Sequence, residues 1–175
     1  MDARYSIAPA RVRDIGALGE IERAAAALLE GHAPRAVIDE VTDESELLEA
    51  QRAGLLWVAL LDDEPVGFAL VSLLGHGSPH LEEIDVHPRQ GRRGVGAALV
   101  RAVCDWASRA GHVEVTLTTF RSLPWNMPFY ARLGFREVAA DEVSPEVRAV
   151  VEDETARGLD PARRVVMRYQ PDSPG

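Results

Sequence analysis

Apolar side chains along this 175-residue chain change spacing from one segment to the next, and the changes mark helices and strands. A short strand over Tyr5 to Ile7 precedes Arg11 to Leu29, where apolar residues recur at helical spacing. Thr42 or Asp43 can cap a second helix, and Gly54 stands where that helix would end. The chain therefore opens on a strand followed by two helices.

The middle of the chain has strand-like runs. Leu55 to Leu61 and Val66 to Leu74 are apolar segments separated by four turn-forming residues, Asp62 to Pro65, which predicts an antiparallel hairpin in the middle of a sheet. Gly75 to Pro79 is a predicted loop. Leu81 to His87 is a further predicted strand, which Pro88 ends.

Helical spacing returns at Gly94 and continues until Gly111 offers a stop after Ala110. The residues of the tail, 170–175, are expected to be frayed. The other predicted elements are a strand at Val113 to Thr119, a short helix at Asn126 to Leu133, a strand at Phe135 to Val138, a helix at Ser144 to Arg157 and a last strand at Arg164 to Tyr169.

Length and composition predict one domain, 1–175, because 46% hydrophobic residues can fill a single sizeable core. No secretory signal and no apolar window of about 18 residues is seen, so we expect a cytoplasmic protein without a membrane span. Cys104 is the only cysteine, which excludes an intrachain disulfide, and we interpret it as a small core residue.

A formal net charge of −9 argues against nucleic-acid binding through a broad basic surface. The sign reverses locally, because Arg89, Arg92 and Arg93 fall together in one glycine-rich stretch. That stretch, IDVHPRQGRRGVGAAL from Ile84 to Leu99, places a strand, a loop and a helix in succession. Unpaired amides at a helix N-terminus, the helix dipole and glycines form an anion site, which suits a pyrophosphate.

Two common phosphate motifs do not fit this stretch, since it lacks Gly-Lys-Ser/Thr and Leu99 stands where the dinucleotide fingerprint needs a third glycine. The stretch resembles motif A of the GNAT superfamily of N-acetyltransferases, R/Q-x-x-G-x-G/A, with Val86-His87-Pro88 as the preceding strand end. It departs at the Arg/Gln position, which Gly91 occupies, while Gln90 lies one residue earlier. Downstream, WNMPFYARLGF from Trp125 to Phe135 resembles motif B.

The resemblance implies the α/β GNAT fold: a mixed, mainly antiparallel sheet flanked by helices and splayed after the fourth strand. It also implies acetyl-CoA as co-substrate and an amine as acceptor. Backbone amides from Gly91 to Gly96 would bind the pyrophosphate, and the Val86 region would bind the thioester oxygen. The cofactor-binding residues that it implies are Ile84, Asp85, Val86, Gly91, Arg92, Arg93, Gly94, Val95, Gly96 and Asn126. Asn126 has an alternative role as a helix cap.

Acetyl transfer needs a base for the amine and an acid for the leaving thiolate. Tyr130 matches the motif B tyrosine, and the resemblance implies that it is the general acid. We choose Glu82 as the base, with Glu83, His80 or a water chain as alternatives. Glu82 and Glu83 cannot both point into one slot unless a bulge intervenes, because strand neighbours face opposite sides.

The histidines lack the spacing of metal ligands, so we expect no metal. Thr118 to Arg121 can shape an acceptor pocket, but they can equally be solvated loop residues. The acceptor itself, a small molecule or a peptide, is not identified by motif A. The alternative function is a non-catalytic acyl-CoA-binding or sensor module. A homodimer through the last strands is a further expectation.

Overall fold

The computed structural model describes residues 5–171, in which seven strands follow the order β1-β2-β3-β4-β5-β7-β6. The sheet is mixed: β1–β2, β2–β3, β5–β7 and β6–β7 are antiparallel pairs, and β4 pairs with β5 in parallel. The described residues divide into two compact units, 5–72 with 82–103 and 73–81 with 104–171. Both units contain strands and helices, which agrees with the α/β class that the sequence predicts.

The first unit contains the predicted strand and two predicted helices. Asp43 precedes α3 as its N-cap residue, and Gly54 ends it in the left-handed region at φ 72°. A helix of four residues, α2, was not predicted, because so short an element has no apolar period. The elements are β1 (Ser6–Pro9), α1 (Ile15–Ala26), α2 (Arg35–Ile38), α3 (Glu44–Ala53), β2 (Leu56–Leu61), β3 (Glu64–Leu74), the end of β4 (Ser78–Val86) and most of α4 (Val95–Arg109).

The β2–β3 hairpin has a shorter turn than the four residues predicted from the sequence. Asp62 and Asp63 alone form the turn, and both have positive φ, 51° and 67°. That geometry suits the right-handed twist of a hairpin. Pro65 lies inside β3 opposite Leu60, where the register shifts, and a strand tolerates proline at such an irregularity. The turn prediction was therefore wrong at Glu64 and Pro65, which belong to β3.

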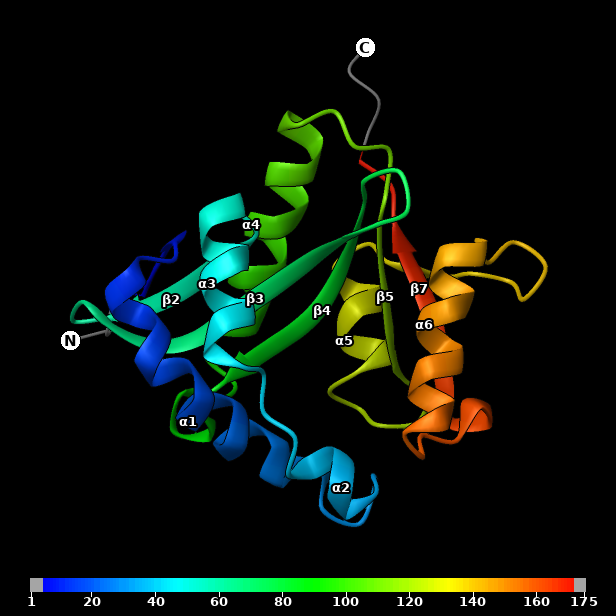
Figure 1. The fold of residues 1–175 in the computed structure, drawn as a ribbon, viewed down its shortest axis with the longest axis horizontal. Helices are drawn as coiled ribbons and strands as arrows, with labels where there is room; N and C mark the ends of the chain where they lie inside the picture. Colours follow the sequence, from blue (N-terminus) through cyan, green and yellow to red (C-terminus); the bar gives the residue numbers. More distant parts are fainter. Residues whose placement is uncertain (1–4, 172–175) are drawn as a thin grey trace. The chain divides into compact units, whose positions relative to one another are not determined.

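Two layers of helix cover the strands of this unit (Figure 1). Leu56, Val58 and Phe68 point to the face covered by α1 and α3, where they join one core cluster with Leu18 and Leu47. The alternate residues of β2 and β3 point to the other face, where the side chain of Leu99 in α4 lies against Gly67. The unit thus buries both faces of its strands.

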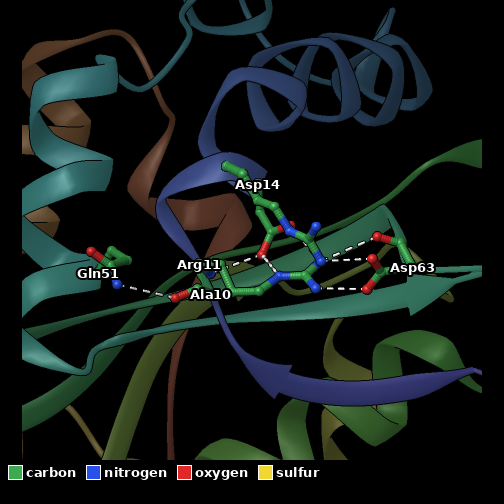
Figure 2. Close-up of polar contacts among 6 residues, drawn as sticks. Ala10, Arg11, Asp14, Gln51 and Asp63 are labelled. Carbon is green, nitrogen blue, oxygen red and sulfur yellow. Dashed lines mark hydrogen bonds and ion pairs between the residues drawn. The ribbon is translucent and has the colours of Figure 1, made fainter.

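Figure 2 shows how the chain leaving β1 is fixed to the hairpin turn. Arg11 donates to Asp14 Oδ1 at 2.7 Å and to Asp63 Oδ1 at 2.6 Å. Gln51 of α3 donates to the Ala10 carbonyl at 3.2 Å. These contacts hold the segment between β1 and α1 against the hairpin turn and α3.

The second unit contains β5 (Val115–Phe120), α5 (Met127–Arg132), β6 (Arg136–Glu137), α6 (Pro145–Ala156) and β7 (Arg164–Tyr169). Ser144 caps α6 by accepting from Val147 N at 3.3 Å. The strand β4 begins at Ser78, so the predicted loop is limited to Gly75 to Gly77. Cys104 is buried, as predicted. Of the tail, residues 172–175 lie outside the described residues.

Candidate active site

The glycine-rich turn joins the end of β4 to the start of α4 within the first unit. His87 N donates to Val66 O of β3 at 2.9 Å, which ends the strand pairing. A single 3-10 turn, Pro88–Gln90, follows, and Gly91 N closes it on Pro88 O at 3.1 Å. Arg92 and Gly94 both have positive φ, 61° and 78°, so the chain reverses sharply before α4. The predicted strand, loop and helix are confirmed.

The turn presents donors and positive charge. Ala98 N donates to Gly94 O at 3.0 Å as the first bond of α4, so the amides of Val95 and Gly96 have no acceptor within the helix. Gly91, Arg92, Arg93 and Gly94 are exposed. At the positive end of a 15-residue helix, this arrangement fits a phosphate or pyrophosphate. The residues present therefore suit the cofactor that motif A implies.

The last residues of β4 have an orientation that the sequence did not give. Because His87 N donates to β3, and amides of successive strand residues point to opposite edges, the amide of Val86 points away from β3. The same alternation directs the amide of Ile84 away from β3. The carbonyl of Asp85 faces β3, where it lies 2.8 Å from the position of a Cβ on Gly67. A role for the Asp85 main chain in cofactor binding stays a prediction.

Three carboxyl groups meet where α1 crosses β4. One oxygen from each of Glu22, Glu83 and Asp85 lies within 4.8 Å of the others. Glu22 accepts hydrogen bonds from Thr42 N at 3.0 Å and from Thr42 Oγ1 at 3.0 Å. Asp85 Oδ2 is buried and accepts no bond from an amide, hydroxyl or guanidinium of the described residues. Glu83 and Asp85 are two residues apart in β4, so their side chains lie on the same face of the strand.

Burial and mutual repulsion set the protonation of this carboxylate cluster. Burial raises the pKa of Glu83 well above its usual value, and the charges of Asp85 and Glu22 raise it further. Burial and the charge of Glu22 raise the pKa of Asp85 to about 7, against the hydrogen bond from Glu83. The pKa of Glu22 is raised by burial, partly offset by Thr42. The cluster can hold and release a proton near neutral pH.

The cluster was not predicted from the sequence, because Glu22 lies far from Glu83 and Asp85 along the chain. Alternation was the available signal, since Glu83 and Asp85 are two residues apart and so share a face. Glu82, the predicted base, is an exposed residue of β4 on the opposite face. Its assignment stays a prediction. Carboxylate oxygens are also ligands for hard divalent cations, so the expectation of no metal stays untested.

His80, one alternative base, lies in the second unit and is 2% exposed. Its Nδ1 is 2.9 Å from Thr116 Oγ1, and burial lowers its pKa to about 4. A neutral, enclosed imidazole of this kind is suited to packing between β4 and β5. His80 and Thr116 are also partners in the parallel pairing of β4 with β5.

Tyr130 and Asn126 belong to the second unit. Tyr130 is 8% exposed, and its ring packs edge-on against Phe129 and Phe135 with centroids 5.0 and 5.7 Å apart. Asn126 precedes α5 in the N-cap position, but its side chain makes no capping hydrogen bond. The capping role considered for Asn126 is therefore not observed, and its role in cofactor binding stays a prediction.

Thr118, Phe120 and Arg121 take part in side-chain contacts within the second unit. Thr118 Oγ1 donates to Glu154, which also binds Arg164 at 3.0 Å. Arg164 stacks over the ring of Phe120 at 4.7 Å. Arg121 pairs with Glu137 at 2.7 Å. These contacts give the three side chains a role in packing within the second unit. An acceptor pocket at this place stays a prediction.

The family model described as Acetyltransferase (GNAT) family matches residues 24–135, which include both the turn and the Tyr130 segment. That match covers more than half of the chain. The chain therefore belongs to the GNAT family of acetyltransferases. No helix among residues 5–171 is long and apolar enough to cross a membrane.

Relatives agree with this placement. The uncharacterized N-acetyltransferase YafP of Escherichia coli K12 is 31% identical over 101 residues, which are 58% of this chain and 59% of that relative. Among solved structures, the PaiA N-acetyltransferase of Thermoplasma acidophilum in complex with coenzyme A matches with TM-score 0.73 and 16% identity, over 95% of this chain and 99% of that one. The ribosomal-protein-S18-alanine N-acetyltransferase of E. coli matches with TM-score 0.67 and 18% identity, over 98% and 97%. These similarities show the GNAT fold.

Proposed function

We propose that this chain is an acetyl-CoA-dependent N-acetyltransferase that transfers the acetyl group directly to a primary amine of a small molecule or peptide. The observation that carries the proposal is the turn between β4 and α4, with its exposed glycines and arginines and the amides of Val95 and Gly96, which have no acceptor within the helix. Family membership and a neighbour solved with coenzyme A support it. Location in the cytoplasm and a homodimer stay predictions.

In this proposal the turn binds the pyrophosphate, with Arg92 and Arg93 adding charge and Asn126 contacting the cofactor. The amides that point away from β3 at Ile84 and Val86 are free of that strand and can bind the cofactor arm and the thioester oxygen. The nitrogen of the amine forms a bond to the acetyl carbon and loses a proton to a base. The carbon–sulfur bond breaks, and Tyr130 protonates the leaving thiolate.

Two carboxylates compete for the role of base. Glu82 is the residue expected from the sequence. Glu83, with Asp85, is favoured by its environment, because a base that works near pH 7 needs a carboxyl pKa raised toward that value. Glu82→Gln and Glu83→Gln form a matched pair of neighbours on opposite faces of β4. The variant that removes the base should lose about 100-fold in kcat at neutral pH.

The function is tested by incubating the protein with acetyl-CoA and a panel of amines and measuring thiol release. Release that depends on one class of amine, with acetylated product found by mass spectrometry, supports the proposal and names the acceptor class. Binding of acetyl-CoA without release with any amine favours the non-catalytic acyl-CoA-binding module instead. Absence of binding contradicts both functions.

A further inference from the structure

The phenol of Tyr5 bridges two side chains of the glycine-rich turn. Tyr5 Oη donates to Gln90 Oε1 at 2.5 Å, and Arg93 Nη1 donates to Tyr5 Oη at 3.3 Å. The contact joins residues that are 85 and 88 positions apart in the sequence. Neither the sequence motif nor the family match includes Tyr5, because the match begins at residue 24.

The topology of the first unit explains why Tyr5 reaches the turn. Ser6 pairs with Leu60 near the end of β2, and the two-residue hairpin turn returns the chain into β3. Val66, near the start of β3, is bonded to His87 at the end of β4. The start of β1, the hairpin turn and the end of β4 therefore lie at the same end of the sheet, and Tyr5 is half-buried there.

The bridge holds a segment whose glycines give its backbone conformational freedom. Gly91 and Gly94 lie between or beside the two bridged residues, and glycine loses more backbone freedom on ordering than any other residue. Arg92, within the segment, is held at φ 61°, a conformation that is uncommon for residues other than glycine. One hydroxyl that binds both Gln90 and Arg93 lowers the freedom of the turn before a ligand arrives.

We propose that Tyr5 is a positioning residue for the pyrophosphate turn, acting through Gln90 and Arg93 to preorganise it for coenzyme A. This inference rests on the proposed cofactor site. Tyr5 acts on binding of the cofactor and not on the reacting atoms, so it changes the affinity for coenzyme A and leaves the chemical step unchanged. Gln90 has the same role, which gives this side chain a function although it stands one residue before the motif position.

The test is isothermal calorimetry of coenzyme A on the wild type, Tyr5→Phe, Gln90→Met and the double variant. Tyr5→Phe keeps the ring and removes only the hydroxyl, and we expect its Kd for coenzyme A to rise about three- to tenfold. Gln90→Met should raise the Kd by a similar factor. The Kd of the double variant should not exceed that of the single variant with the higher Kd, because both substitutions remove the same bridge. Pantetheine, which lacks the pyrophosphate, should bind all four proteins equally.

Kinetics give a second readout once an acceptor is known: KM for acetyl-CoA should rise in Tyr5→Phe while kcat and KM for the amine stay unchanged. A Kd within a factor of about 1.5 of the wild type in Tyr5→Phe overturns the inference, as does additivity of the two single variants. Equal loss of pantetheine binding also overturns it, since that indicates a general structural effect. If the wild type binds no coenzyme A, the proposed function fails instead.

Discussion

A carboxyl oxygen of Glu83 and one of Asp85 lie within 4.8 Å of each other on the face of β4 that meets Glu22. Two carboxyl groups this close repel each other when both are charged, and they can share a hydrogen bond only when at least one is protonated. Burial and the neighbouring charges favour that state by raising the pKa of both groups, that of Asp85 to about 7. The protonation of this pair therefore affects both the stability of the first unit and the ability of Glu83 to act as a base.

This pair should make stability fall as pH rises. The pKa of Asp85 is about 7 in the folded protein and about 3.9 when unfolded, so between these values the folded state binds the extra proton and the free energy of unfolding decreases with pH. Asp85→Asn cannot titrate. We expect it to raise the melting temperature at pH 8 by several degrees relative to the wild type, and to have a smaller effect at pH 5.

Thermal unfolding of the two proteins between pH 5 and pH 8 checks this expectation. The comparison has to be between variants, because His80, with a pKa of about 4 in the folded state, acts in the opposite direction as pH falls below its unfolded value. Parallel melting curves for the wild type and Asp85→Asn across this range would show that Asp85 does not hold the proton.

Local signals in the sequence predicted most elements of the fold. Gly54 and Gly111 were expected to end helices, and both have positive φ at those ends. The last strand, Arg164–Tyr169, was placed without error, since apolar alternation and the preceding turn define it. The four-residue helix α2 and the position of Pro65 inside β3 were not predicted, because one is too short for periodicity and the other depends on a register shift.

The candidate site was predicted only in its local part. The turn from Gly91 to Gly96 is contiguous, so its glycines and arginines could be recognised from sequence. The meeting of Glu22 with Glu83 and Asp85, and that of Tyr5 with Gln90, each depend on strands and helices far apart in the chain. Alternation shows that Glu82 and Glu83 face opposite sides, but it cannot show which side α1 covers.

Gly67 is required by the close approach of β3 to β4. A Cβ at this position would lie 2.8 Å from Asp85 O, 3.2 Å from Val86 Cγ2 and 3.4 Å from Leu99 Cδ1. Gly67→Ala should therefore cost about 1–3 kcal/mol through overpacking, which lowers the melting temperature by about 3–10 °C in a chain of this size.

Gly16→Ala is the matched control for Gly67→Ala. Gly16 is exposed in α1, and a Cβ there meets nothing within 4 Å. We expect it to stabilise the protein by about 0.5–1 kcal/mol, because alanine favours a helix over glycine. Thermal unfolding of both variants gives the answer, and an unchanged melting temperature for Gly67→Ala would mean that β3 and β4 can separate at little cost.

Tyr130 tests the acid half of the proposed reaction. Tyr130→Phe keeps the ring packed against Phe129 and Phe135 and removes the hydroxyl. If the phenol protonates the leaving thiolate, kcat should fall by about 100-fold while the Kd for coenzyme A changes by less than about twofold. Steady-state kinetics with the accepted amine provide the measurement. A kcat within a factor of about 3 of the wild type would end the assignment.

The most direct test of the account is whether coenzyme A binds at the turn, measured by calorimetry on Gly94→Asp and Gly31→Asp. The two glycines have nearly the same φ, 78° and 79°, and a Cβ at either position meets nothing within 4 Å, so the backbone cost of the substitutions is matched. Only Gly94→Asp places a negative charge beside the proposed pyrophosphate. We predict that its Kd for coenzyme A rises at least about tenfold while Gly31→Asp binds like the wild type. Equal affinity in all three proteins would contradict the assignment of the turn as the cofactor site.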